Sequence, residues 1–400
     1  MTAGGLQSLR DANRRLVVEA LKQHGVASRA DLARFTGLSR STVSTIVADL
    51  QTNQLVIERA SDEAGEGQVG RPPVLLALDR SAGAVAGIDF GHSHIAVAVA
   101  DLAHTVLAER WQQIDVDHRS AEGLDAAATL LDHALADAGV EASQLIGIGM
   151  GLPGPISGEQ NTVGSTSILP GWVGVNPAEE MERRLGLAVQ VENDANLGAL
   201  AEVTWGAGRG CSDVAYIKAS SGVGAGLLIG GRLHRGAGGT AGEIGHTHFR
   251  DEGPVCRCGN RGCIETVART DTITASVSAG RGVQLTIGEV IDLARAGDPP
   301  AQRVIGDAGR HIGVAVANLC NLLNPQRVIV GGELSAAGDI LLAPLVDSLR
   351  RYAIPTAAAD VSVLAGELGK RAEVMGALAL VLREPDPGVA KVAHPLRGLA

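Results

Sequence analysis

Aromatic side chains are scarce: this chain of 400 residues has three tryptophans, two tyrosines and three phenylalanines, 2% of the total. Its cores must therefore rest on Ala, Val, Leu and Ile, which supply most of the 45% hydrophobic residues. That share is enough for sizeable cores, and a chain of this length is expected to divide into more than one domain.

Long apolar runs and a cysteine framework are also missing. The apolar runs, such as 95–100, are far too short to cross a bilayer, and no apolar segment with a cleavage site begins the chain. The five cysteines are an odd number, and only Cys211 and Cys320 lie outside one cluster, which argues against a disulfide framework. We expect a soluble, cytoplasmic protein in a reducing compartment, with no membrane partner.

Negative charge dominates the chain and would discourage contact with nucleic acid if it were spread evenly. Arg and Lys number 34 against 44 Asp and Glu, a net charge of −10. The acidity belongs to the later part, because basic residues outnumber acidic ones in the first 57 residues. These are Arg10, Arg14, Arg15, Lys22, Arg29, Arg34 and Arg40 against Asp11, Glu19, Asp31 and Asp49.

The amino-terminal segment has the pattern of a helix-turn-helix. Apolar residues at helical spacing predict a first helix over 10–24, and Ser28 can cap a second, short helix that Gly37 ends. Ser39 can cap a third helix, with a buried stripe of Val43, Ile46, Val47 and Leu50. Its outward face is small, hydroxyl-rich and cationic, which favours DNA contact: Ser39, Arg40, Ser41, Thr42, Ser44 and Thr45. The alternative is a plain three-helix bundle.

Two short apolar stretches, 55–59 and 74–78, are predicted strands joined by the polar, glycine-rich segment 61–70, which is the pattern of a wing. Arg71, within Gly-Arg-Pro-Pro, would then lie on an extended ribbon that fits a narrow minor groove. The alternative is that this segment only links two domains.

The window 242–265 gathers one histidine, three cysteines and two flanking glutamates. One imidazole nitrogen and three thiolates are a ligand set that Zn2+ takes in a tetrahedral structural site. Glycines within the window let so short a segment wrap round one ion. Ordinary buried cysteines or a redox pair are the alternative. The four ligands would be His246, Cys256, Cys258 and Cys263.

From residue 84 onward the pattern changes to strands and glycine turns, and it occurs twice. Two strand-turn-strand units are predicted, 84–102 with Asp89 at its bend and 214–229 with the glycine-rich turn 220–226, so two halves built alike are expected. Glycine turns let backbone N–H groups approach phosphate oxygens, and a carboxylate at the first turn can hold Mg2+. Either turn by itself could be just a tight hairpin.

A third polar element, 192–196, follows the apolar stretch 187–191. Asp194 at such a strand end can accept a proton from a hydroxyl nucleophile, and Asn193 can donate to and accept from neighbouring hydroxyls. The alternative is an N-cap for the helix predicted through 197–203, and both can hold at once.

These motifs resemble those of the ROK family, meaning repressors, open reading frames and sugar kinases. The resemblance rests on E-I-G-H with C-x-C-G-x-x-G-C-x-E, on N-D-A-N, on G-L-P-G-P at 151–155 and on V-G-G-E-L at 330–334. The amino-terminal helix-turn-helix and wing, called the head from here on, are followed by G-R-P-P and resemble the xylose-repressor and N-acetylglucosamine-repressor branch. The family implies an α/β protein with a winged helix-turn-helix over 1–80, a two-lobed actin-like, ribonuclease-H-like sugar-binding domain over 81–385, and a flexible tail over 386–400.

The resemblance also implies which residues bind a sugar and a nucleotide. The sugar-contacting positions would be Asn193, Asp194, Glu243, His246 and Glu265. Asp194 would be the catalytic base if the chain is a kinase, and His246 would serve twice, with one ring nitrogen on zinc and the other toward a sugar hydroxyl. The nucleotide-binding positions would be Asp89, Gly91, Ser221, Gly222, Gly224, Gly331 and Gly332.

Three positions depart from the kinase pattern: two argue against binding of ATP and Mg2+, and the third argues against glucose as the ligand. His92 stands where the kinases have the second glycine of Asp-x-Gly-Gly-Thr, so a side chain lies where the triphosphate needs bare backbone. Ser220 replaces a glycine in the second loop. Ile168, four residues before Trp172, replaces an asparagine, so one hydrogen bond to the sugar would be lost unless Ser167 substitutes.

Three functions follow from these patterns. The first is a transcriptional regulator, a repressor whose effector is a sugar or sugar derivative; a homodimer or homotetramer would read a palindromic operator in double-stranded DNA. The second is an ATP-dependent sugar kinase with an appended DNA-binding head. The third is a regulator that answers to a protein partner. Scattered histidines, His92 and His94 among them, are interpreted as structural or exposed.

Overall fold

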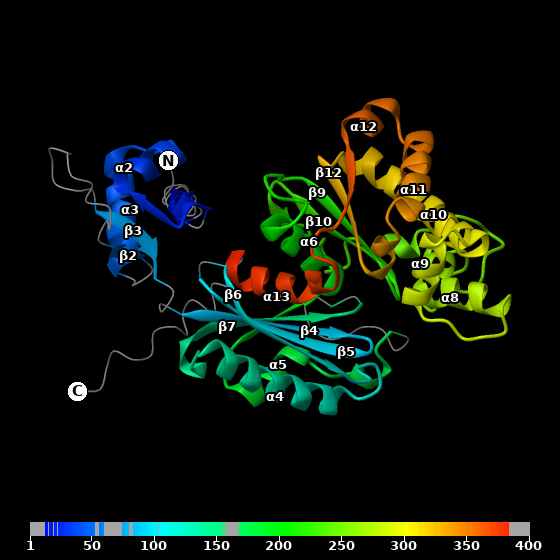
Figure 1. Ribbon diagram of the computed structural model, residues 1–400, viewed down its shortest axis with the longest axis horizontal. Helices are drawn as coiled ribbons and strands as arrows, with labels where there is room; N and C mark the ends of the chain where they lie inside the picture. Colours follow the sequence, from blue (N-terminus) through cyan, green and yellow to red (C-terminus); the bar gives the residue numbers. More distant parts are fainter. Residues whose placement is uncertain are drawn as a thin grey trace. The chain divides into compact units, whose positions relative to one another are not determined.

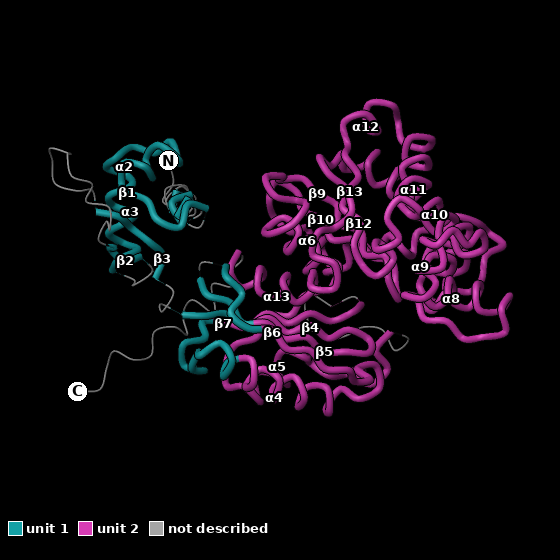
Figure 2. Tube along the Cα trace, viewed as in Figure 1, with its two compact units in different colours: residues 1–85, 99–108, 135–146 teal, residues 86–98, 109–134, 147–400 magenta. Residues whose placement is uncertain are grey.

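The computed structural model describes residues 13–14, 16–18, 20–21, 23–52, 56–59, 74–79, 83–102, 104–154, 156 and 168–383. The chain divides into two compact units, one of residues 1–85, 99–108 and 135–146 and one of residues 86–98, 109–134 and 147–400 (Figure 2). Four predicted features lie outside the described residues: Arg71, the segment 61–70 of the wing, Ser167 and the tail 386–400.

The predicted second and third helices of the head are confirmed as α2 (Arg29–Thr36) and α3 (Arg40–Thr52) (Figure 1). Ser28 caps α2 through a capping box with the third residue of the helix. Gly37 follows α2 with a φ of 70°, a left-handed backbone that glycine adopts without strain. The Ser39 Oγ accepts from the N–H of the third residue of α3 at 3.1 Å, so Ser39 caps α3 as predicted.

A small sheet and core hold the head together. The two predicted strands are confirmed as β2 (Val56–Arg59) and β3 (Leu75–Leu78), and a short strand that was not predicted, β1 (Val26–Ser28), pairs antiparallel with β3. The buried stripe predicted for α3 is narrower than expected, because Ile46 is only half-buried. The buried core comprises Val17, Ala20, Leu21, Ala27, Leu32, Val43, Val47, Leu50, Val56, Leu76 and Leu78.

Two five-stranded sheets with the same topology form the body. The strand orders are β6-β5-β4-β7-β8 and β11-β10-β9-β12-β13, so the predicted duplication is confirmed. The first sheet comprises β4 (Ala84–Gly91), β5 (His94–Asp101), β6 (Val106–Gln113), β7 (Leu145–Leu152) and β8 (Val189–Asn193). The second comprises β9 (Val214–Ala219), β10 (Val223–Ile229), β11 (Arg232–Leu233), β12 (Arg327–Gly331) and β13 (Ser362–Ala365).

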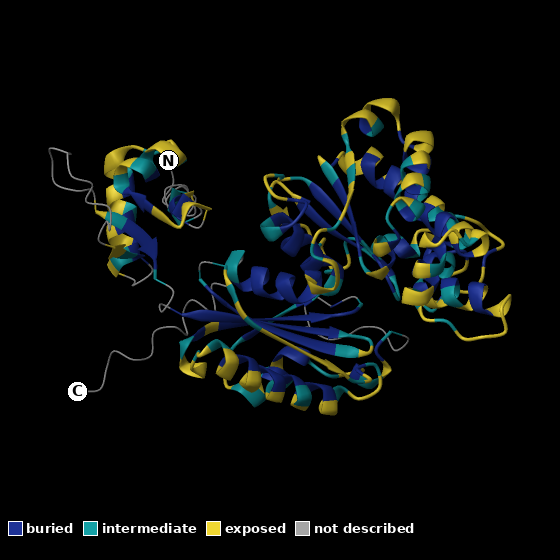
Figure 3. Cartoon of the chain, in the orientation of Figure 1, coloured by how far each residue is buried: buried dark blue, intermediate teal, exposed yellow. Residues whose placement is uncertain are grey.

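Helices cover the sheets. Figure 1 shows α4 (Ser120–Ala138) and α5 (Pro177–Leu185) on one face of the first sheet and α13 (Ala372–Arg383) on the other. The central strands are buried, whereas much of the outer surface of α4 is exposed (Figure 3). Among the described residues, no helix has the length and apolar character that crossing a bilayer requires. The remaining α-helices are α6 (Asp194–Trp205), α7 (Glu265–Ala268), α8 (Thr270–Ala279), α9 (Ile287–Arg295), α10 (Pro299–Leu323), α11 (Asp339–Tyr352) and α12 (Pro355–Asp360).

Helix α13 packs closely on β4, β7 and α6, because glycines stand at the points of contact. A Cβ on Gly149 of β7 would lie 2.0 Å from the carbonyl oxygen of Ala377, and a Cβ on Gly376 would lie 2.0 Å from that of Leu197 in α6. Gly87 of β4 faces the backbone of α13 in the same way, at 2.6 Å. Because only glycine permits such close approach, these three glycines let α13 pack directly on β4, β7 and α6.

Candidate functional site

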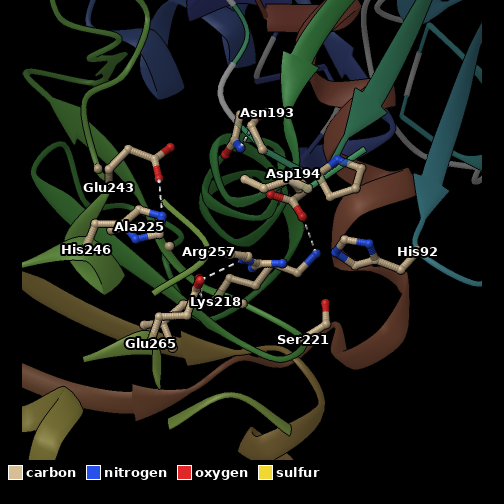
Figure 4. A pocket seen from close by; sticks show the side chains of 17 residues that line it. His92, Asn193, Asp194, Lys218, Ser221, Ala225, Glu243, His246, Arg257 and Glu265 are labelled. Carbon is tan, nitrogen blue, oxygen red and sulfur yellow. Dashed lines mark hydrogen bonds and ion pairs between the residues drawn. The ribbon is translucent and has the colours of Figure 1, made fainter. Parts of the chain in front are cut away.

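One cavity in the body brings the predicted sugar-contacting residues together (Figure 4). All five line it: Asn193, Asp194, Glu243, His246 and Glu265. The cavity is also lined by three of the predicted nucleotide-binding residues, Ser221, Gly222 and Gly224. Within the described part of the chain, the other four of that set do not line it: Asp89, Gly91, Gly331 and Gly332.

The junction of β8 and α6 supplies two of these side chains. The Asn193 Oδ1 accepts from the N–H groups of Ala195 and Asn196 at 2.9 and 3.3 Å and so caps α6. The Asn193 Nδ2 donates to the carbonyl of Gly154 at 2.9 Å. Asp194 begins α6, where the positive end of the helix dipole stabilises its carboxylate. The helix cap and the pocket-lining position thus fall on one element.

Lys218 of β9 lines the same cavity and was not predicted. Its Nζ lies 2.8 Å from Asp194 Oδ2 and 3.0 Å from the Oε1 of Glu373 in α13, and all three side chains are largely buried. Burial opposes the charged form of Lys218, but the two carboxylates outweigh it and raise its pKa well above the ordinary value. The signal in the sequence was a single lysine within an otherwise apolar strand.

Arg257 is a second pocket residue that was not predicted. Its Nε donates to Glu265 Oε1 at 2.8 Å, while Glu265 Oε2 accepts from the N–H of Val223 at 3.1 Å. Burial disfavours ionisation of Glu265, but the hydrogen bond and the charge of Arg257 outweigh it and lower the pKa of this carboxyl. Glu265 is therefore an oriented carboxylate. The position of Arg257 between two cysteines gave no sign that it would reach the cavity.

The four predicted metal ligands converge beside the cavity. One donor atom from each, a ring nitrogen of His246 and three Sγ atoms, lie within 4.8 Å of one another. Cys256 Sγ lies 3.6 Å from His246 Nδ1, and Cys258 Sγ lies 3.7 Å from Cys263 Sγ. Tetrahedral ligands with metal–sulfur bonds of about 2.3 Å place neighbouring sulfurs about 3.8 Å apart. The cluster could therefore hold a metal ion of that geometry.

His246 faces both the cluster and the cavity. Its Nδ1 lies toward Cys256, whereas its Nε2 lies 3.8 Å from Glu243 Oε2 (Figure 4). A metal on Nδ1 would leave the ring proton on Nε2, on the side of the cavity. Burial, together with the charges of Asp194 and Glu265, raises the pKa of Glu243 to about 7. One ring nitrogen of His246 thus faces the cysteines and the other faces Glu243 at the cavity.

The first glycine turn is covered by a different histidine from the one expected. A Cβ on Gly91 would lie 2.1 Å from the ring of His94, whose Nε2 lies 3.3 Å from Asp89 Oδ2 and whose ring stacks on that of Trp111 at 5.9 Å. His92 lines the cavity instead. The interpretation of His92 as structural or exposed agrees with its pairing with Asp117 at 2.7 Å, but it did not foresee that the side chain lines the pocket.

Side chains also cover two other glycines of the predicted nucleotide site. A Cβ on Gly222 would lie 2.9 Å from Arg257 Nη2, and a Cβ on Gly331 would lie 2.1 Å from the hydroxyl oxygen of Tyr216. A nucleotide phosphate approaches bare backbone N–H groups most closely where no side chain intervenes. Ile168 lines the cavity, so the position that the kinases give to asparagine holds an apolar side chain here.

The outward face of α3 is the candidate DNA interface. Ser39, Arg40, Ser41, Ser44 and Thr45 are exposed, while Thr42 is half-buried. Three of these hydroxyls form a cluster at the start of the helix, since Ser39 Oγ lies 2.9 Å from Ser41 Oγ and 2.8 Å from Thr42 Oγ1. Hydroxyls, an arginine and free N–H groups at a helix N-terminus are suited to phosphate and base-edge contacts.

Comparisons with known proteins agree with a DNA-binding head and a sugar-kinase-like body. Residues 85–384 match the ROK family, and residues 10–57 match the family described as winged helix-turn-helix DNA-binding. The chain is 28% identical to the xylose repressor of Caldicellulosiruptor bescii, over 94% of this chain and 96% of that protein. It is 34% identical to a glucokinase of Halalkalibacterium halodurans, over 75% of this chain and 95% of that protein.

A comparison with solved structures also finds a ROK family protein. The crystal structure of a ROK family transcriptional regulator, a homolog of the E. coli MLC protein, matches this fold with a TM-score of 0.76 at 27% identity, covering 94% of this chain and 96% of that one. The two repeated sheets form the actin-like body, and the head is a winged helix-turn-helix. From its motifs, its fold and the match over most of its length, this chain belongs to the ROK family.

Proposed function

We propose that this protein is a transcriptional repressor controlled by a sugar or sugar derivative. The head binds operator DNA through α3, and the effector binds in the cavity and alters the affinity for DNA. The cavity carries the proposal: carboxylates, an amide and an imidazole suited to sugar hydroxyls line it, while side chains cover Gly91, Gly222 and Gly331. Relatives named as repressors support it, because they match nearly the whole chain.

The proposal includes a structural Zn2+ in the cysteine and histidine cluster. His246, Cys256, Cys258 and Cys263 would hold it, and the distances between their donor atoms support this. When bound, the ion supplies no reaction chemistry and serves to fix the fold of the loop. The chain's own contribution is to aim the free nitrogen of His246 at the effector.

A homodimer or homotetramer is also part of the proposal. One small head reads few base pairs, whereas two heads related by a two-fold axis read a palindromic operator. Effector binding that favours an arrangement with the heads wrongly spaced would lower operator affinity by the coupling free energy between the two sites. In this proposal residues 1–80 bind DNA and residues 81–385 bind the effector.

Replacement of Arg40 with alanine tests the DNA-binding part. The side chain is exposed at the start of α3, and loss of one base or phosphate contact in each half-site is expected to weaken binding by about 1–3 kcal/mol per head. Affinity would be measured by gel shift on a duplex that the wild-type chain selects from a random pool. Thr42→Ala should behave similarly, whereas Arg350→Ala, an exposed arginine of α11, should bind as the wild type does.

These variants should leave the effector site unchanged, so their thermal shift with the effector should match that of the wild type. Unchanged DNA affinity in both Arg40→Ala and Thr42→Ala would show that α3 is not the reading helix.

The competing function is an ATP-dependent sugar kinase, and one observation favours it: Asp194, the base in such enzymes, lies in the cavity. A coupled assay with ATP and a panel of hexoses separates the two functions. We expect no turnover above that of Asp194→Ala. Turnover in the wild type that Asp194→Ala abolishes would show that the protein is a sugar kinase, either in place of the proposed repressor function or in addition to it.

A further inference from the structure

We propose that His92 binds the effector directly, with Asp117 determining which ring nitrogen faces it. This inference rests on the proposed function and adds to it a specificity-determining residue. His92 lies in the turn between β4 and β5, and it is the part of that turn that lines the cavity. Figure 4 shows its ring at the same end of the pocket as the Lys218 ammonium.

Asp117 holds the ring of His92 in a defined orientation. The His92 Nδ1 lies 2.7 Å from Asp117 Oδ1, and both side chains are about three quarters buried, at 23% and 26% exposed. A carboxylate at this distance accepts the Nδ1–H. Nε2 is then the nitrogen left for the cavity, and in the neutral ring it accepts a hydrogen bond.

Asp117 is itself held in place by hydrogen bonds of the surrounding backbone. The Val116 N–H donates to the carbonyl of His92 at 3.2 Å, and the Gly171 N–H donates to the carbonyl of Asp117 at 2.8 Å. The Nε1–H of the fully buried Trp172 donates to the carbonyl of Val116 at 2.8 Å. The turn and Asp117 are therefore held by one network, which pre-organises the ring before any ligand arrives.

Lys218, at the same end of the cavity, complements a hydrogen-bond acceptor at His92 (Figure 4). Lys218 has three N–H groups, and ion pairs with Asp194 and Glu373 engage two of them. A sugar hydroxyl both donates and accepts, so a single hydroxyl can donate to His92 Nε2 and accept from Lys218. Neither partner lies among the sugar-contacting residues that the sequence implied, and together they would select one hydroxyl of the effector.

The test combines substitutions in the protein with deletions in the ligand. Binding of D-xylose, D-glucose and N-acetyl-D-glucosamine to the full chain would be measured by calorimetry, followed by the mono-deoxy analogues of the sugar that binds most tightly. In the wild type, the analogue that lacks the hydroxyl bound by His92 should lose about 10-fold in affinity, the value of one well-made hydrogen bond. In His92→Ala the parent sugar should lose a similar factor, and removal of that hydroxyl should then cost less affinity than it does in the wild type, because only the contact with Lys218 is left to lose.

Two further variants separate contact from structure. Asp117→Asn should weaken the same analogue-dependent preference while His92 is still present, because the carboxylate no longer fixes the ring. His118→Ala is the matched control, since His118 pairs with Asp115 at 3.2 Å in the same segment but is exposed and lies outside the cavity. Its affinities should equal those of the wild type.

The outcomes are distinct. If every deoxy analogue loses the same factor in His92→Ala as in the wild type, His92 contacts no hydroxyl and the inference is overturned. If the wild type binds none of the three sugars, the sugar-effector part of the proposed function fails first, and the inference fails with it. If His92→Ala reduces the affinity lost on removal of one particular hydroxyl and of no other, the result supports both the sugar effector and the contact with His92.

Discussion

Lys218→Met is expected to lower the free energy of unfolding by about 3–5 kcal/mol, the usual cost of removing one partner from a buried ion pair. Methionine keeps the length of the side chain but not its charge. Asp194 and Glu373 would then share a largely buried space without the ammonium that lies 2.8 and 3.0 Å from them. Urea unfolding at neutral pH measures the loss, and Lys370→Met, an exposed lysine, is the control.

The deficit should also depend on pH. The pKa of Lys218 is raised in the folded protein, so its contribution is complete at neutral pH and is lost only as the pH rises through that folded pKa. In the variant the deficit should shrink on acidification, because burial raises the pKa of Glu373 and a protonated Glu373 no longer needs a counter-charge. A loss no larger than that of Lys370→Met at neutral pH would contradict the assignment of Lys218 as a buried counter-ion.

Cys263→Ser is expected to abolish stoichiometric metal binding and to weaken effector binding by about 10–100-fold, the range seen when the support of a metal site is removed. Cys263 is buried and its Sγ lies 3.7 Å from that of Cys258. Without the ion, nothing fixes which nitrogen of His246 carries the proton on the side of the cavity. Elemental analysis gives the metal content, and calorimetry with the sugar that binds the wild type gives the affinity.

Cys211→Ser is the matched control, because Cys211 is half-buried and belongs to no cluster among the described residues. It should retain one equivalent of Zn2+ and the affinity of the wild type. Treatment of the wild type with a chelator should reproduce the Cys263→Ser result, and added Zn2+ should reverse it. One equivalent of zinc and full sugar affinity in Cys263→Ser would show that the cluster does not support the pocket.

The head was predictable because its signals are local. Ser28 and Ser39 are caps, Gly37 has a left-handed backbone, and the buried stripe of α3 follows the helical period, so the starts of α2 and α3 and the end of α2 were placed to within about a residue. The strand β1 was missed, because three residues between two helices carry no alternation that can be recognised. A local sequence pattern can predict a helix or strand only when that element is long enough to contain a full period of the pattern.

The pocket was predictable only where a motif names its residues. Lys218 and Glu373 lie far apart in the chain and meet because α13 packs against α6, which no local pattern records. The two histidines of the first turn show the same limit. The sequence placed a side chain over the glycine turn, but the geometry of the hairpin decides that His94 covers Gly91 while His92 reaches the cavity.

The close packing of α13 on the first sheet makes the last helix of the fold part of its first lobe. The first sheet ends with β8 at Asn193, but the helix that covers one of its faces begins at Ala372. At ribosomal rates of 5–20 residues per second, about 10–35 s separate the two. During that interval α13 does not yet cover Gly87 and Gly149, so we expect this face of the first sheet to be completed only after the carboxyl-terminal helix has been synthesised.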